Sequence, residues 1–139
     1  MELTKLIYPN MRSELIDHLS ALADPEYQER VWVKHQPAPG IEYDEFDYVV
    51  HFLFDDTSLA TDPESCIGWY LTNEREVVAV RIVVNSINVL FDKCGKCLKD
   101  SEYLAKPEWL DVVAAAKTAL GVFKIGATGQ AVAKRTDDD

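Results

Sequence analysis

Hydrophobic side chains recur at helical spacing in three parts of the chain. Within residues 10–23, four large apolar side chains share one face, those of Met11, Leu15, Leu19 and Leu22. This spacing predicts an amphipathic helix. The same periodicity predicts a long helix over residues 74–93 and a third over residues 106–120, which we expect Gly121 to end.

A different pattern, with a period of two, runs through residues 46–54. One face would carry Tyr48, Val50, Phe52 and Phe54, and the other Val49, His51 and Leu53. This alternation of aromatic and β-branched residues predicts a strand covered on both faces. Residues 31–33 and 67–71 are candidates for further short strands. Together these elements predict an α+β fold with three main helices packed on a small two- or three-stranded sheet.

The length of 139 residues predicts a single domain. We expect residues 1–121 to form it and residues 122–139 to be a loose C-terminal extension, because glycines and terminal acids replace the apolar periodicity there. A chain of this size buries enough surface to fold without a metal or a disulfide.

The charge balance narrows the classes of partner. Asp and Glu number 24 against 14 Lys and Arg, a formal net charge of −10. Such a chain would be repelled by nucleic acids and anionic membranes, whereas a basic protein would be steered toward it. No apolar run is long enough for a membrane span or a signal peptide, and the odd number of cysteines is typical of a reducing compartment. The sequence therefore predicts a cytoplasmic protein.

Motifs for metal or redox chemistry are weak. Cys94 and Cys97 form a CxxC pair, but it follows the expected end of a helix, whereas redox pairs normally lie at a helix N-terminus, which lowers the thiol pKa. A zinc site would need two further ligands at suitable spacing. We therefore expect no metal and no cofactor.

His51 is the main candidate for catalysis. Asp47 and Asp55 are near it in sequence, so it could act as a general base. The alternative, which we weigh more heavily, is a hydrogen-bonded histidine in the core of a strand. No phosphate-binding loop and no nucleophile motif is present, and we do not expect an enzyme.

The stretch IEYDEFDYVVHFLFDD, residues 41–56, interleaves carboxylates with aromatic rings and contains no Lys or Arg. Aromatic anchors with flanking charges are typical of protein interfaces. The alternative is a core segment, with Phe46 and Tyr48 buried, beside a solvated acidic face. We predict a partner-binding surface made of Glu42, Tyr43, Asp44, Glu45, Asp47, Asp55, Asp56, Asp62 and Glu64.

Several segments resemble a known family. LADPEYQERVWV at residues 22–33, VVHFLFDDT at 49–57, DPES at 62–65 and IGW at 67–69 resemble a family of small uncharacterised bacterial proteins common in actinobacteria. This resemblance covers residues 10–120 and implies no catalytic residue. In size, acidity and its mixture of acids and rings, the chain also resembles immunity proteins of contact-dependent growth inhibition systems. That resemblance implies a protein that binds and blocks a toxin domain, often a nuclease.

The leading hypothesis is thus a non-catalytic immunity protein that neutralises a basic toxin by occlusion. Its carboxylates would pair with the Lys and Arg residues that bind the toxin's substrate, and charge reversal at Asp44, Glu45 and Asp47 would weaken binding without unfolding the chain. The alternatives are a housekeeping regulatory or adaptor domain without a toxin partner, and a small enzyme that uses His51.

Overall fold

The structure is a computed structural model that describes residues 6–36 and 44–132, the side chains of residues 125–132 excepted. The α-helices are α1 (Pro9–Leu22), α2 (Pro25–Tyr27), α3 (Phe46–His51), α4 (Glu74–Cys94), α5 (Asp100–Leu104) and α6 (Pro107–Val132). Two π-helical segments, η1 (Gln28–Val33) and η2 (Phe52–Asp56), continue α2 and α3, and η3 (Pro63–Cys66) is a short 3₁₀ helix.

The three helices predicted from periodicity are confirmed, with one boundary wrong. The side chain of Asn73 accepts a hydrogen bond from the Glu76 N–H at 3.0 Å and caps α4. Gly95 follows α4 with a φ of 85°, a conformation that glycine adopts readily. Gly121 does not end α6, which continues to Val132 and buries Phe123 in the core.

The predicted α+β fold is wrong, because the described residues contain no strand. Their only β pairing is an isolated bridge between Ile67 and Leu71. Residues 46–56 are helical, with α3 leading directly into η2. The buried side chains there are Phe46, Val49, Phe52 and Leu53. Their spacing of three to four residues suits a helix with one buried face, so the run fits both periodicities.

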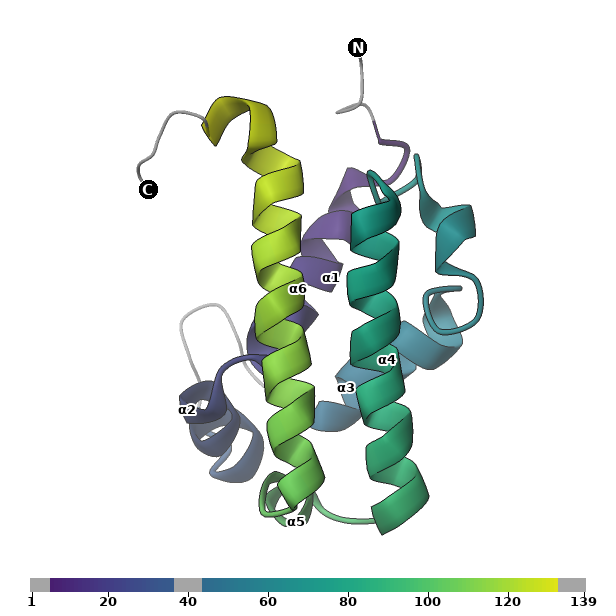
Figure 1. The fold of residues 1–139 in the computed structure, drawn as a ribbon. Helices are drawn as coiled ribbons and strands as arrows, with labels where there is room; N and C mark the ends of the chain where they lie inside the picture. Colours follow the sequence, from purple (N-terminus) through teal and green to yellow (C-terminus); the bar gives the residue numbers. More distant parts are fainter. Residues whose placement is uncertain (1–5, 37–43, 133–139) are drawn as a thin grey trace.

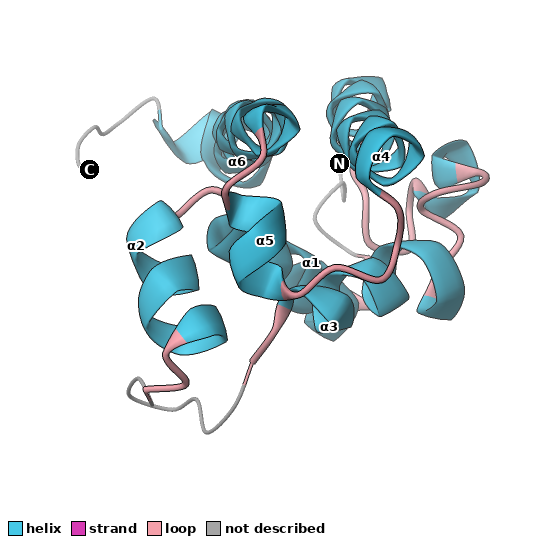
Figure 2. Ribbon diagram, turned by 90° about the horizontal axis from the view of Figure 1, so that it is seen from below, coloured by secondary structure: helices cyan, strands magenta, loops and turns pink. Residues whose placement is uncertain are grey.

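The helices form two layers (Figures 1 and 2). Antiparallel α4 and α6 lie side by side in one layer. The second layer, which contains α1 and α3, covers only one side of this pair, as the view from below shows (Figure 2). The core between the layers includes Leu15, Leu19, Leu22, Val49, Val77, Val80, Ile87, Val112 and Ala116.

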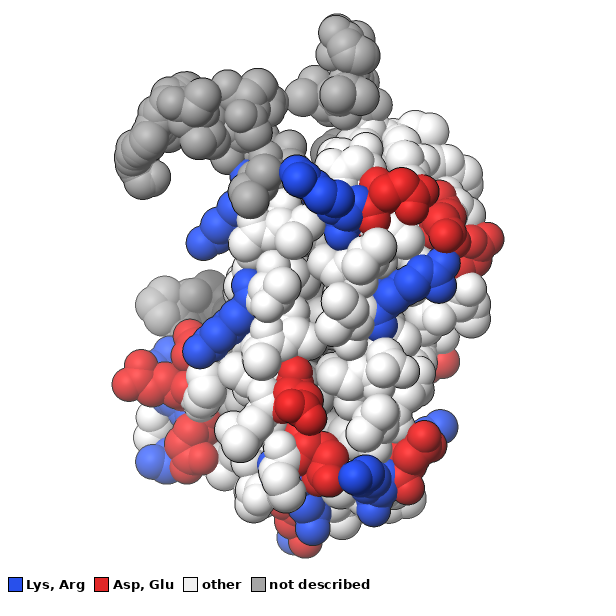
Figure 3. Space-filling view, viewed as in Figure 1, with Lys and Arg blue, Asp and Glu red and all other residues white. Residues whose placement is uncertain are grey.

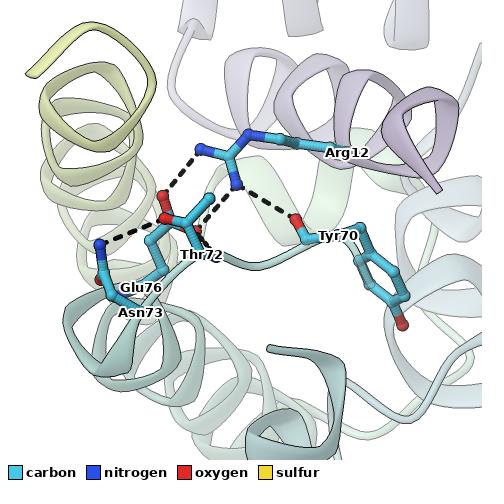
Figure 4. Close-up of polar contacts among 5 residues, drawn as sticks. All are labelled: Arg12, Tyr70, Thr72, Asn73 and Glu76. Carbon is cyan, nitrogen blue, oxygen red and sulfur yellow. Dashed lines mark hydrogen bonds and ion pairs between the residues drawn. The ribbon is translucent and has the colours of Figure 1, made fainter. Parts of the chain in front are cut away.

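A buried ion pair joins the two layers (Figure 4). The Arg12 guanidinium of α1 donates to both carboxylate oxygens of Glu76 in α4, at 2.8 and 2.7 Å, and to the Tyr70 carbonyl at 3.1 Å. The Thr72 N–H donates to the same carboxylate at 2.7 Å. The guanidinium carbon lies 4.9 Å from the centre of the Phe123 ring of α6. One charged pair thus fixes α1, α4, α6 and the chain that leads into α4.

Candidate functional site

A pocket of about 430 Å³ opens where α3 begins, beside η1, α5 and the end of α4. Aromatic rings form its base. The Phe46 ring lies at the centre, 5.5 Å from Tyr103, 5.8 Å from Trp32 and 6.1 Å from Phe91, measured between ring centroids. Behind the pocket, the Trp109 ring meets Phe46 edge-on at 4.9 Å. Edge-on and tilted rings at these distances attract one another beyond the effect of burial.

Three carboxylates line this pocket, those of Glu45, Asp47 and Asp100. Asp100, the first residue of α5, accepts a hydrogen bond from the Phe46 N–H at 3.0 Å and so ties α5 to the start of α3. Burial raises the pKa of Asp100, and the neighbouring charges of Glu45 and Asp47 raise it further, against the lowering effect of the Phe46 N–H and His35. Negative charge is thus concentrated beside apolar rings.

The lining of the pocket also includes basic side chains. Lys96 and Lys99, in the connection from α4 to α5, both contribute to its lining. The Lys96 ammonium lies 5.9 Å from the centre of the Phe91 ring, within the range of a cation–π contact. The base of the pocket therefore already accommodates one cationic side chain from its own chain.

Asp44 lies behind this pocket and serves the fold. Its carboxylate accepts hydrogen bonds from the Tyr27 hydroxyl at 2.7 Å and from the Trp32 indole N–H at 3.0 Å. Burial raises the pKa of the Tyr27 phenol, and the Asp44 carboxylate raises it further. Charge reversal at Asp44 would disrupt these two hydrogen bonds and should destabilise the fold. The prediction that charge reversal leaves the chain folded is therefore wrong for Asp44.

The structure brings together only part of the predicted binding surface. Glu45 and Asp47 line the pocket, while Glu42 and Tyr43 lie outside the described residues. The remaining acids lie elsewhere: Asp55 and Asp56 in η2, Asp62 before η3, and Glu64 in η3, where it pairs with Arg81 of α4. Sequence reasoning missed Asp100 and the two lysines, and no local signal marks them, because they approach α3 only through the packing of α5.

His51 is on the surface, so the prediction of a core histidine is wrong. Its ring lies between two carboxylates of the same helical run, 3.2 Å from Asp47 and 2.7 Å from Asp55. All three side chains are more than half exposed, and His51 is not among the residues that line the pocket. Within the described residues, no cluster of His, Cys, Asp and Glu is arranged to hold a metal ion.

The two carboxylates should keep His51 protonated to higher pH than usual. The hydrogen bond with Asp55 and then the charge of Asp47 raise the His51 pKa above its ordinary 6.5. NMR titration of the ring should show this shift, and Asp55→Asn should reduce it more than Asp47→Asn. Because the folded pKa exceeds the unfolded one, the stabilisation is complete below pH 6.5 and is lost as pH rises through the folded pKa.

Asp56→Asn serves as the control for this titration. It removes a neighbouring charge that has no contact with the His51 ring, so the midpoint should change little. A wild-type midpoint at or below 6.5 would contradict the assignment of His51 as a cation held between two acids.

Comparisons with known proteins give a family but no activity. No curated protein and no solved structure matches the chain. Over residues 6–36 and 44–132, no helix has the length and hydrophobicity that crossing a membrane requires. A family model, Domain of unknown function (DUF7945), matches residues 6–128. This match includes α1, the pocket and the greater part of α6, and the chain therefore belongs to the DUF7945 family.

Proposed function

We propose that the chain is a non-catalytic binding protein whose pocket at the start of α3 receives a Lys or Arg side chain of a basic partner protein. The observation that carries this proposal is the meeting of three carboxylates, Glu45, Asp47 and Asp100, with a base of aromatic rings. We further propose that the partner is a toxin domain and that the chain neutralises it in the cytoplasm as an immunity protein.

The pocket favours a cation over an anion because its three carboxylates outnumber its two lysines, Lys96 and Lys99. A guanidinium or ammonium group gains from ring faces and from nearby carboxylates at the same time. Such a cation would also favour the ionised form of Asp100, whose raised pKa reflects its burial among other acids. Binding should therefore be accompanied by proton release from this carboxyl group at pH values where it is partly protonated in the free protein.

Neutralisation would follow from occlusion. Toxins that act on nucleic acids hold their substrate with Lys and Arg, and a pocket occupied by one of these side chains removes it from the substrate. The net charge of −10 would speed the encounter. The exposed carboxylates of Asp56 and Asp62 lie outside the pocket and would contribute to this attraction rather than to the seated contact.

Charge reversal at the pocket provides the test. The double variant Glu45→Lys/Asp47→Lys should weaken binding to the toxin domain at least tenfold, or about 1.4 kcal/mol, since two favourable charges become repulsive beside the incoming cation. The first step is to look for a toxin gene directly upstream of the gene for this chain, because the absence of one would favour an adaptor. With the product of such a gene, affinity would be measured by calorimetry at two salt concentrations and protection by growth during co-expression.

The matched control is Asp56→Lys/Asp62→Lys, which changes the net charge equally but outside the pocket. It should slow association and leave most of the affinity. If the control abolishes protection while the pocket variant retains it, the interface lies elsewhere on the chain. A partner that binds at the pocket but has no toxicity would instead identify an adaptor.

A further inference from the structure

α4 carries a second apolar stripe that faces away from the core. Val78, Ile82 and Val89 are 53%, 50% and 36% exposed. With Asn85 they are spaced by four, three and four residues, the pattern of a coiled-coil seam with one polar position. Helices that bury only one face normally place charged residues here. This second stripe therefore points to a further helical contact.

The neighbouring face of α6 carries short side chains at a similar spacing of three, four and three residues, at Asp111, Ala114, Thr118 and Gly121. A groove of about 440 Å³ lies between the two stripes and includes Ile82, Val89, Asp111 and Thr118 in its lining. Figure 3 shows this face as largely uncharged in its upper part, with acidic side chains in its lower middle and further charged side chains along its edges. No described element covers this side of the α4 and α6 layer (Figure 2).

We propose that a second copy of the chain packs here, related by a two-fold axis perpendicular to the helices, to give an antiparallel four-helix bundle. The Lys93 to Glu108 ion pair at 3.7 Å fixes the level of α4 against α6. Counting along the two antiparallel helices from this ion pair places Val89 beside Asp111 and Ile82 beside Thr118. All four residues line the groove, which agrees with this alignment. Asn85 on α4 and Ala114 on α6 therefore lie at one level, where a two-fold axis can pass.

This axis makes the surface complementary to itself. It brings Ile82 of one copy against Val89 of the other, and Asp111 against Lys117 and Thr118. Within the described residues neither Asp111 nor Lys117 has an ion pair of its own. A two-fold axis parallel to the helices would instead place Val89 of one copy over Asp111 of the other, and Lys117 would then form no ion pair across the interface.

Asn85 would lie next to the axis, facing its own copy. An amide both donates and accepts, so two such groups can bond to one another, and a single Asn in an apolar seam fixes the register of paired helices. The face is roughly 30 Å long and 20 Å wide, about 600 Å² per copy, from ordinary helix dimensions. That area is below the usual 800 Å² or so per partner, so we expect a dimer that dissociates at micromolar concentrations.

Analytical ultracentrifugation of the full chain between 5 and 500 µM tests the proposal. The wild type should pass from monomer to dimer within this range, and Ile82→Lys should remain monomeric. Ile7→Lys, at a 61% exposed isoleucine outside the groove, should dimerise normally. Asp111→Lys and Lys117→Asp should each weaken the dimer severalfold, while the double variant Asp111→Lys/Lys117→Asp should restore it, because each new residue meets the other across the axis.

Three results would overturn this inference. A wild type that is monomeric at 500 µM would leave the face to a helix of a different protein. A dimer insensitive to Ile82→Lys would place the contact elsewhere. A dimer that Ile82→Lys breaks, but that the charge exchange does not restore, would exclude the antiparallel arrangement.

Discussion

Replacing Arg12 with alanine should destabilise the fold by about 3–5 kcal/mol, the usual cost of removing one partner from a buried ion pair. Glu76 is fully buried, and without the guanidinium its carboxylate would keep the Thr72 N–H as its hydrogen-bond donor. The loss would also leave the Tyr70 carbonyl without its donor and remove the cation from the Phe123 ring. Few domains exceed 5–15 kcal/mol of total stability, so this variant should unfold in much less urea.

The exposed pair of Arg81 and Glu64 is the internal control, since both side chains are about half exposed. Arg81→Ala should cost less than about 1 kcal/mol. The double variant Arg12→Met/Glu76→Leu should recover most of the loss, because it removes both buried charges and retains apolar volume. Urea unfolding at low protein concentration would measure all three, and equal midpoints for Arg12→Ala and Arg81→Ala would contradict the role assigned to the buried pair.

The helices that the sequence predicts well are those with both a period and a boundary signal. α4 has an apolar stripe, a capping Asn73 and Gly95 beyond its end, and these local features agree with one another. In residues 46–54, the local features do not agree on one type of secondary structure. Large apolar residues occupy nearly every position there, so helical and strand periodicities fit equally, and only the absence of a partner strand decides between them.

The candidate site likewise combines residues that the local sequence pattern indicates with residues that only tertiary packing brings close. Glu45 and Asp47, which line the pocket, could be selected as candidate binding residues because acids and rings alternate around them. Asp100 could not, since its approach to Phe46 depends on the packing of α5 against α3. The buried ion pair of Arg12 and Glu76 could not be predicted from the sequence either. A charged residue within a helix usually faces water, and Glu76 in the sequence is simply an acid in a first turn.

Phe46→Ala should be the second most damaging substitution, with an expected loss of about 3–5 kcal/mol, as for other buried phenylalanines. Phe46 is 2% exposed and its ring contacts Trp32, Phe91, Tyr103 and Trp109. These rings come from η1, α4, α5 and α6, so the cavity left by the truncation would lie where four elements meet. The surrounding rings are rigid and could refill it only in part.

Phe46→Leu distinguishes the ring from mere apolar volume. It should cost clearly less than Phe46→Ala because leucine leaves a smaller cavity. It should still weaken binding of the proposed basic partner, because the buried Phe46 ring holds the surrounding rings and the start of α3 in place. Glu45→Lys/Asp47→Lys should do the reverse and weaken binding more than it lowers the urea midpoint, with the lost contact between Asp47 and His51 contributing to the stability change. If Phe46→Leu binds the partner as tightly as the wild type, the aromatic base contributes only to folding, and recognition rests on the carboxylates alone.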